Sequence, residues 1–223
     1  MNYRSLIGFT LAEVLITLGI IGIVAEMTIP SLVNSYQNQI YVTSFKEEFA
    51  IMSSAWQQLI TENGGYIAGV YPTADSALDG LCTKMKCTTI CHSSDDQTKC
   101  FLDTNWLMLN KGAAWQSILG PSAILANGFS FSILGFSSDC SSARYKAETC
   151  FVTYFDTNSF KKPNIMGRDI FEVFVNQNNI TPQGVAGTGG ETFLQAMCDP
   201  NGASGYKGAS CGARILIENG MKY

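Results

Sequence analysis

The feature that most limits what this chain can become is an apolar run near its N-terminus, from Phe9 to Ile29. Apart from threonine and glycine, its polar residues are Glu13 and Glu26. At a helical rise of about 1.5 Å per residue, the run covers roughly 30 Å, the thickness of the hydrocarbon core of a bilayer. We therefore expect a membrane-spanning helix over residues 9–30, followed by a separate body over residues 31–223.

The flanks of this run distinguish it from a cleaved secretory signal. Such signals have a shorter apolar core followed by a small-residue cleavage site, whereas here Pro30 and Ser31 follow and the helical pattern continues. Arg4 precedes the run and every cysteine follows it. The positive-inside rule then places the N-terminus in the cytoplasm and the body outside, so we expect a single-pass membrane protein.

Composition supports an extracytoplasmic body. Charged residues make up 14% of the 223 residues, against about 25% in ordinary soluble proteins, and 46% are hydrophobic. Fourteen basic and eighteen acidic residues give a net charge of −4 without any basic run. That balance lacks the electrostatic signature of a dedicated nucleic-acid binder, so we expect no dedicated nucleic-acid binding.

Eight cysteines point to an oxidising compartment, where disulfides are their usual fate. Eight cysteines allow 105 pairings, but the spacing favours bridges within the segment from Cys82 to Cys100, between Cys140 and Cys150, and between Cys198 and Cys211. A zinc site around His92 is an alternative, although paired C-x-x-C knuckles are missing there. The cysteines stand at Cys82, Cys87, Cys91, Cys100, Cys140, Cys150, Cys198 and Cys211.

Glu13 is anomalous, because a carboxylate inside a membrane helix is unfavourable by a few kcal/mol unless it finds a partner. One interpretation is that Glu13 lies near the cytoplasmic interface and reaches the lipid headgroups. The residues around it suggest another. A short leader with one basic residue ends at Gly8, and the sequence F-T-L-A-E-V-L follows from Phe9.

This stretch resembles the N-terminus of type IV prepilins and type II secretion pseudopilins. The resemblance covers residues 1 to about 60 and includes the leader 1–8, Gly8, Phe9, Glu13, the apolar run and Pro30 near its end. It implies that a prepilin peptidase cuts after Gly8 and methylates Phe9. It also implies that the N-terminal amine of a neighbouring subunit holds Glu13 in a filament. Glu26 departs from the family's uniformly apolar run.

The resemblance further implies a structural role and not an enzymatic one. The expected partners are other pilin or pseudopilin subunits, prepilin peptidase, the inner-membrane assembly platform and the membrane. The expected location is the bacterial inner membrane and then a pilus (fimbrium) or secretion pseudopilus. Two alternatives stay open: a minor tip pilin used for adhesion or uptake, and a single-pass anchored binding protein. Glu13 separates the second from the pilins, because an anchor gains nothing from a carboxylate there.

Beyond Pro30 the pattern predicts an α+β, pilin-like fold, with a long helix packed on an antiparallel sheet and a disulfide-rich head. An apolar stripe predicts that the helix continues to Leu59, through Leu32, Tyr36, Ile40, Phe45, Phe49, Met52 and Trp56. Strands are expected at 129–133, 150–155 and 170–175. We expect a long connection over 66–127 with a helical patch at 103–119, a flexible linker at 184–190, and a short helix or edge strand at 213–217.

The turn between the last two predicted strands carries oxygen ligands of the kind that calcium prefers. These are Asp156, Asn158, Asn164 and Asp169, and their spacing is similar to a turn found in many pilin-like proteins. Asp and Asn also bond to their own backbone in turns, and Lys161 and Lys162 add unfavourable positive charge. Calcium and a purely structural turn are therefore both open.

Catalytic signals are weak. His92 is followed by Ser93, Ser94, Asp95 and Asp96, but the members of a catalytic triad come from separate elements and not from one run. The glycine-rich segment 184–190 lacks the Lys-Ser/Thr of a phosphate-binding loop. Asn179-Ile180-Thr181 matches a glycosylation sequon, which carries little weight in a chain with a bacterial type of N-terminus.

Overall fold

A computed structural model describes residues 8, 10–101, 106–113, 119–135, 137–144, 147–185, 190–202 and 204–223. The chain divides into two compact units, one up to Gln39 and one from Ile40 to Tyr223. The helices are α1 (Leu11–Glu62), α2 (Ala74–Lys84), the 3-10 helix η1 (Gln97–Lys99), α3 (Gly190–Met197) and α4 (Cys211–Glu218). The strands are β1 (Cys87–Cys91), β2 (Ser122–Leu125), β3 (Ser130–Gly135), β4 (Ala143–Arg144), β5 (Ala147–Glu148), β6 (Phe151–Asp156), β7 (Ile170–Val175) and β8 (Ile180–Pro182).

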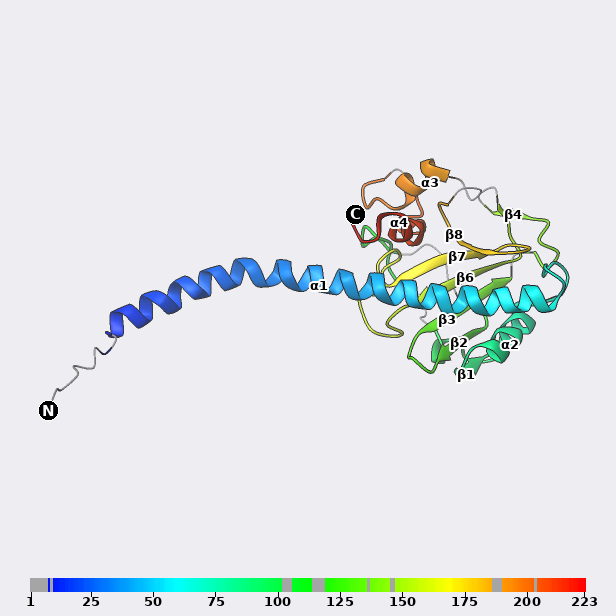
Figure 1. Ribbon diagram of the computed structural model, residues 1–223, viewed down its shortest axis with the longest axis horizontal. Helices are drawn as coiled ribbons and strands as arrows, with labels where there is room; N and C mark the ends of the chain where they lie inside the picture. Colours follow the sequence, from blue (N-terminus) through cyan, green and yellow to red (C-terminus); the bar gives the residue numbers. More distant parts are fainter. Residues whose placement is uncertain are drawn as a thin grey trace. The chain divides into compact units, whose positions relative to one another are not determined.

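The predicted long helix is confirmed as α1, which continues through Pro30 and ends just before the Gly64-Gly65 turn. From Ile40 onward it lies across one face of the main sheet (Figure 1). Its buried side chains recur every three or four residues, as one helix face requires: Val42, Phe45, Glu48, Met52, Ala55, Trp56, Leu59 and Ile60.

This buried stripe differs from the predicted one in two respects. Leu32, Tyr36 and Ile40 are exposed, so burial begins only at Val42. Farther along, the fully buried position is Glu48, whereas the predicted Phe49 is half-buried. The reason is the helical period, because position 48 stands three and four residues from Phe45 and Met52 on the same face.

The main sheet is antiparallel, with the strand order β1-β2-β3-β6-β7-β8. The three predicted strands are confirmed as β3, β6 and β7, with bounds that differ by at most two residues. Aromatic rings join the sheet to α1. Phe45 lies 4.3 Å from Phe171 between ring centroids, and Trp56 stacks on Phe151 at 5.8 Å. These contacts form the centre of the larger hydrophobic core.

The opposite face of the sheet is covered as well. A second core cluster contains Phe101, Trp106, Val152, Tyr154, Met166, Ile170 and Phe174. Consequently β6 and β7 are buried along their whole length, which explains their nearly continuous apolar sequence. The helix α1 covers one face of the sheet. Residues of the loops cover the other face.

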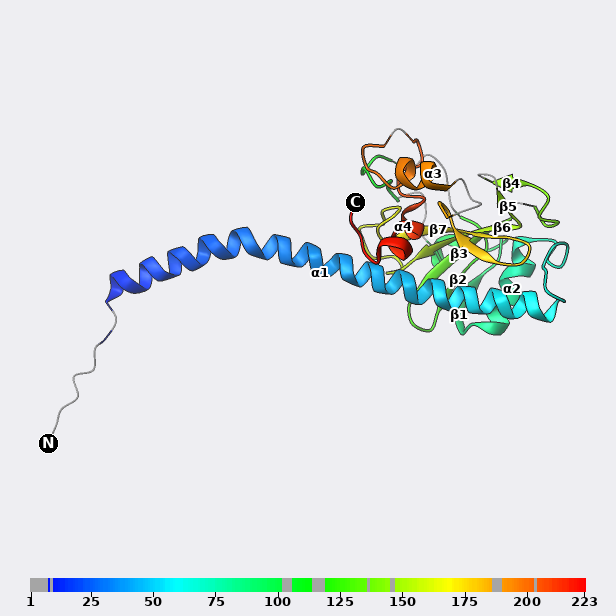
Figure 2. The ribbon, with the colours of Figure 1, turned by 45° about the horizontal axis from the view of Figure 1, so that its top comes forward.

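The segment 66–127 has more regular structure than the predicted connection. It forms α2, β1 and β2, and Figure 2 shows α2 beside β1 and β2. Thr73 and Ser76 cap the start of α2 reciprocally, with N···O distances of 3.1 and 3.2 Å. The predicted helical patch at 103–119 is wrong for its described part 106–113, where Leu107 instead bridges to Ala113 and Ile165; residues 103–105 and 114–118 lie outside the described ranges.

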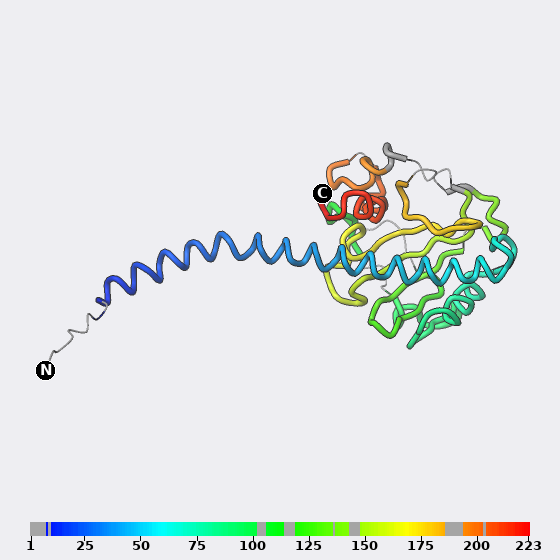
Figure 3. The backbone as a smooth tube through the Cα atoms, viewed as in Figure 1, coloured from blue at the N-terminus to red at the C-terminus, as the bar shows by residue number. Residues whose placement is uncertain are grey.

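The C-terminal part shows whether residues 213–217 form a short helix or an edge strand. The apolar run at 213–217 is helical and belongs to α4. The helices α3 and α4 contact each other, and α4 contacts β7; Figure 3 shows this part of the chain gathered at one side of the sheet. Of the predicted linker, Gly184 and Val185 form a turn and Gly190 begins α3, while 186–189 lie outside the described residues.

The two edges of the main sheet are both irregular. At one edge, β8 is three residues long and includes Pro182. At the other, β1 carries a register shift between Cys87 and Thr89. With its long N-terminal helix, antiparallel six-stranded sheet and four disulfides, the protein has the predicted α+β class, in an arrangement consistent with a pilin-like fold.

Candidate functional site

The first candidate site is the start of α1. The backbone N–H and the hydroxyl of Thr10 both donate to the Glu13 carboxylate at 2.8 Å, and the Glu13 N–H donates back to Thr10 Oγ1 at 3.2 Å. This reciprocal capping satisfies backbone donors that the first helical turn leaves open. Gly8 is exposed just before it, and Phe9 lies outside the described residues. Glu13 therefore has a partner within its own chain.

The apolar side chains that follow Glu13 are exposed throughout the first unit. Leu15 is 62% exposed and Met27 is 77% exposed. None of the most apolar stretch of α1 is buried in the protein. By length and composition, α1 could cross a membrane once. Such an extent of apolar surface must be covered by lipid or by another protein.

Two residues interrupt this segment. Glu26 is exposed among the apolar side chains. Pro30 lies inside the helix and has no N–H to donate, so the carbonyl of Glu26 four residues earlier lacks its usual helical donor. The acidic side chain and the carbonyl to which Pro30 cannot donate therefore belong to the same residue of α1, Glu26.

The second candidate site is the turn between β6 and β7, where the predicted calcium ligands meet in one hydrogen-bond network. Asp169 accepts from the backbone of Asn164 at 2.8 Å and of Ile165 at 2.6 Å, and from the Asn158 side chain at 3.1 Å. Asp156 accepts from the backbone of Asn158 at 3.1 Å. The four predicted residues are thus brought together, and Asp169 already has three protein donors.

Several oxygens around this turn have no hydrogen-bond partner although they are buried. They are Asp156 Oδ2, Asn158 Oδ1 and Asn164 Oδ1, together with both carboxylate oxygens of Glu48 on α1. Buried polar atoms without partners are uncommon. The burial of Glu48 was not predicted from the sequence, because the neighbouring Lys46 and Glu47 are typical of a solvent-facing segment. The helical period was the signal that could have indicated it, since Glu48 shares a helix face with Phe45 and Met52.

The electrostatics favour neutral acids here. Burial is the main reason that the pKa of Asp156 rises to about 8, and Asp169 adds to the effect. Burial also raises the pKa of Glu48 well above its ordinary value, helped by the charges of Asp156 and Glu47. A bound cation would reverse this preference. Within the described ranges, no group of three or more His, Cys, Asp or Glu side chains is arranged to hold a metal ion, and calcium stays a prediction.

All eight cysteines are paired within the chain. The bonds are Cys82–Cys87, Cys91–Cys100, Cys140–Cys150 and Cys198–Cys211, which are local pairs of the kind that the spacing favours. No free thiol is left among them, so the alternative of a zinc site built on these cysteines is wrong for the oxidised chain.

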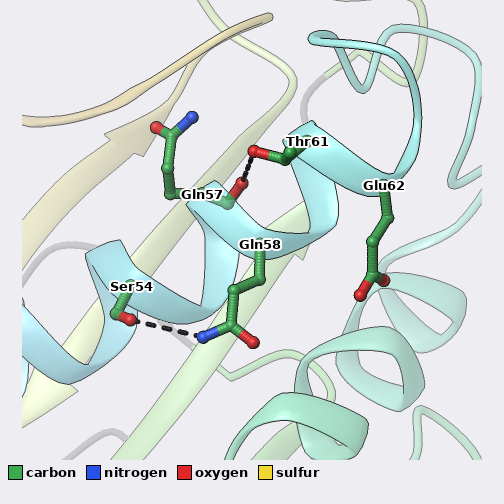
Figure 4. Close-up of a pocket in the computed structure, with 5 residues that line it drawn as sticks. All are labelled: Ser54, Gln57, Gln58, Thr61 and Glu62. Atoms are coloured by element: carbon green, nitrogen blue, oxygen red, sulfur yellow. Dashed lines mark hydrogen bonds between the residues drawn. The ribbon is translucent and has the colours of Figure 1, made fainter.

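A hollow of about 380 Å³ lies against the outer side of α1 and is lined by Ser54, Gln57, Gln58, Thr61 and Glu62 (Figure 4). All five come from one helix, and two pairs of them are joined by hydrogen bonds. The single charged group, Glu62, is paired with Lys84 Nζ at 2.6 Å. The polar groups that line the hollow are thus largely paired with one another or with Lys84. The hollow brings together no nucleophile with a general base.

Comparison with known proteins gives no match to a family model, a curated protein or a solved structure.

Proposed function

We propose that the chain is a pilin-like structural subunit, cut after Gly8 and polymerised through the apolar part of α1 into a type IV pilus or a secretion pseudopilus. The observation that carries this proposal is the exposed apolar surface of α1, with a single acidic residue, Glu13, in its first turn. Lipid can cover this surface before assembly, and α1 helices of neighbouring subunits can cover it afterwards.

The position of Glu13 supports assembly in register. Cleavage after Gly8 would create an amine on Phe9, and a neighbour's amine is an ionic partner for a carboxylate at membrane depth. Such a pair is far stronger in a low-dielectric surrounding than in water. The Thr10 hydroxyl and amide hold the carboxylate in the single chain, so it need not be left unpaired before assembly.

Intact-mass spectrometry of the membrane-extracted protein tests the processing step. We expect a chain that begins at Phe9 and carries one N-methyl group. Gly8→Val should block cleavage, because a branched side chain replaces the residue that leaves room for the peptidase. Gly19→Val is the matched control, since both glycines lie in open space. A wild-type mass that retains residues 1–8, or a cut after Ala25, would contradict the proposal.

A second candidate is a single-pass anchored extracytoplasmic protein. The observation in its favour is the Thr10–Glu13 capping, which gives the carboxylate a role within one chain. The two candidates differ in the effect of Glu13→Val. A subunit should still insert and fold but disappear from the sheared surface fraction, whereas Glu26→Val, which also removes an acid from the apolar run, should still reach it. If Glu13→Val reaches that fraction as well as the wild type does, Glu13 has no register role.

A further inference from the structure

His92 is the single histidine of the chain, and carboxylates surround it. Its Nε2 lies 2.8 Å from Asp79 Oδ1, and its Nδ1 lies 3.8 Å from Asp95 Oδ2. Asp79 belongs to α2, whereas Asp95 belongs to the same loop as His92. The imidazole therefore links the loop that follows β1 to the helix α2.

The next residue makes a parallel link to the same helix. Ser93 donates from its backbone N–H to Asp75 Oδ1 at 2.8 Å and from its hydroxyl to Asp75 Oδ2 at 2.7 Å. Asp75 and Asp79 stand four residues apart on α2 and so share one helix face. We call Asp75, Asp79, His92, Ser93 and Asp95 the His92 cluster.

Disulfides fix the chain on either side of this cluster. Cys82–Cys87 ties α2 to the start of β1, and Cys91–Cys100 closes the loop 92–99 at its base. The loop itself is held to α2 by the polar contacts of the cluster. Those contacts are solvent-accessible, since the side chains of His92 and Asp79 are 41% and 62% exposed. Protonation of His92 can therefore change the attachment of the loop without disturbing the core.

We propose that His92 is a proton-operated latch, which holds the loop 92–99 against α2 while the imidazole is protonated and loosens it as the imidazole loses its proton. A charged imidazole donates to Asp79 and attracts Asp95 and Asp75. A neutral imidazole can keep one hydrogen bond, but it no longer offsets the mutual repulsion of the three carboxylates.

The ionisable groups that face His92 are all carboxylates, and each favours the protonated imidazole. The hydrogen bond to Asp79 is the main reason that the pKa of His92 is raised above 6.5. Burial is the next largest effect and opposes the rise, whereas the charges of Asp79, Asp75 and Asp95 add to it. Because the folded-state pKa is the higher one, the latch is fully closed below the unfolded value of about 6.5. It opens as the pH rises through the folded value.

The test uses the full chain in detergent micelles with ¹³C-labelled histidine, which reports on one residue. We expect the ring signal to titrate with a midpoint above 6.5, and Asp79→Asn to lower that midpoint. In parallel, hydrogen exchange of the amides 92–95, corrected for intrinsic rates, should rise several-fold between pH 6 and pH 8.

Two variants separate the latch from a merely structural loop. His92→Gln should abolish the pH dependence of exchange, because glutamine hydrogen-bonds without titrating. Asp96→Asn is the matched control: Asp96 caps η1 through Thr98, so its loss can raise exchange at every pH but should leave the His92 midpoint in place. A midpoint at or below 6.5, or the same corrected exchange at pH 6 and pH 8, would overturn the proposal.

Discussion

The carboxyl group of Glu48 is fully buried between α1 and the sheet, and neither of its oxygens has a hydrogen-bond partner. A charged carboxylate in such a place would be strongly unfavourable, so the fold keeps the neutral acid. The folded protein then holds a proton that the unfolded chain releases above a pKa of about 4.3. Stability contributed by this proton is complete below that pH and is lost as the pH rises toward the folded pKa.

We therefore expect Glu48→Gln to flatten the decline of stability with pH. For wild type, this one group lowers the free energy of unfolding by up to about 1.4 kcal/mol per pH unit above the unfolded pKa. Melting temperatures between pH 5 and pH 8, measured in chelator, should show the variant gaining on the wild type as the pH rises.

Glu47→Gln is the control for this experiment, because Glu47 is the neighbouring acid and is exposed. It should leave the pH slope almost unchanged. An equal slope for wild type and Glu48→Gln would mean that Glu48 is charged or solvated in the folded protein.

Among the elements, the strands β3, β6 and β7 could be predicted from the sequence, whereas α2, β1 and β2, which lie between α1 and β3, could not. The apolar runs of β3, β6 and β7 are bounded by turn residues, and that pattern was sufficient. The helix α2 is short, and its buried face is limited to Ala77, Leu78 and Leu81. Its Gly80 and its cysteine obscure the periodicity, so only tertiary packing and the cap at Thr73 define it. The strands β1 and β2 were missed for a related reason, since four or five mixed residues carry too little periodicity.

The cap of α2 gives a prediction at this scale. Thr73→Ala removes the side chain that accepts from the Ser76 N–H and should lower the free energy of unfolding by about 1 kcal/mol. Thr83→Ala is the control, because Thr83 is an exposed residue near the other end of α2. Denaturant melts of the two variants should differ by most of that amount. Equal midpoints would indicate that packing alone fixes the start of α2.

The turn between β6 and β7 tests the calcium prediction. If the turn binds calcium, chelator should lower the melting temperature, and Asp156→Ala should remove that sensitivity by deleting an anionic ligand. The effect should grow from pH 6 to pH 8, because a carboxyl whose pKa is about 8 without the ion must release its proton to bind.

Asp139→Asn is a suitable comparison, since Asp139 also anchors a polar turn through Ser137 and Ser141 but lies outside this network. That variant should keep the response to chelator. A melting temperature that is the same with calcium and with chelator would leave the turn with a purely structural role.

At the scale of the whole molecule, the head combines two apolar cores with four local covalent bonds. The number and spacing of the cysteines are enough to predict disulfides, whereas the second core could not be predicted from the sequence. Its cover over β6 and β7 comes from residues of separate loops, such as Phe101, Trp106 and Met166, and no local pattern links them. Glu48 differs, because the helical period places it on the same face as Phe45 and Met52, although the sequence alone does not show that a sheet covers that face.

The bonds should contribute unequally to stability. Replacing Cys198 and Cys211 together by alanine opens a loop with a sequence separation of 13 and should cost about 3 kcal/mol. The same change at Cys82 and Cys87, with a separation of 5, should cost about 1 kcal/mol less, because a shorter loop restricts the unfolded chain less. Denaturant unfolding of the two double variants gives the comparison, and the reverse order would show that native contacts outweigh chain entropy.

The irregular edges of the main sheet affect how the heads of neighbouring copies can interact. Proline in β8 cannot donate a ladder hydrogen bond, and the shifted register of β1 interrupts the row of groups that a foreign strand would need. Neither margin is a good template for a further strand. If many copies are gathered along one fibre through α1, their heads should stay separate folded bodies instead of fusing into a continuous cross-β aggregate.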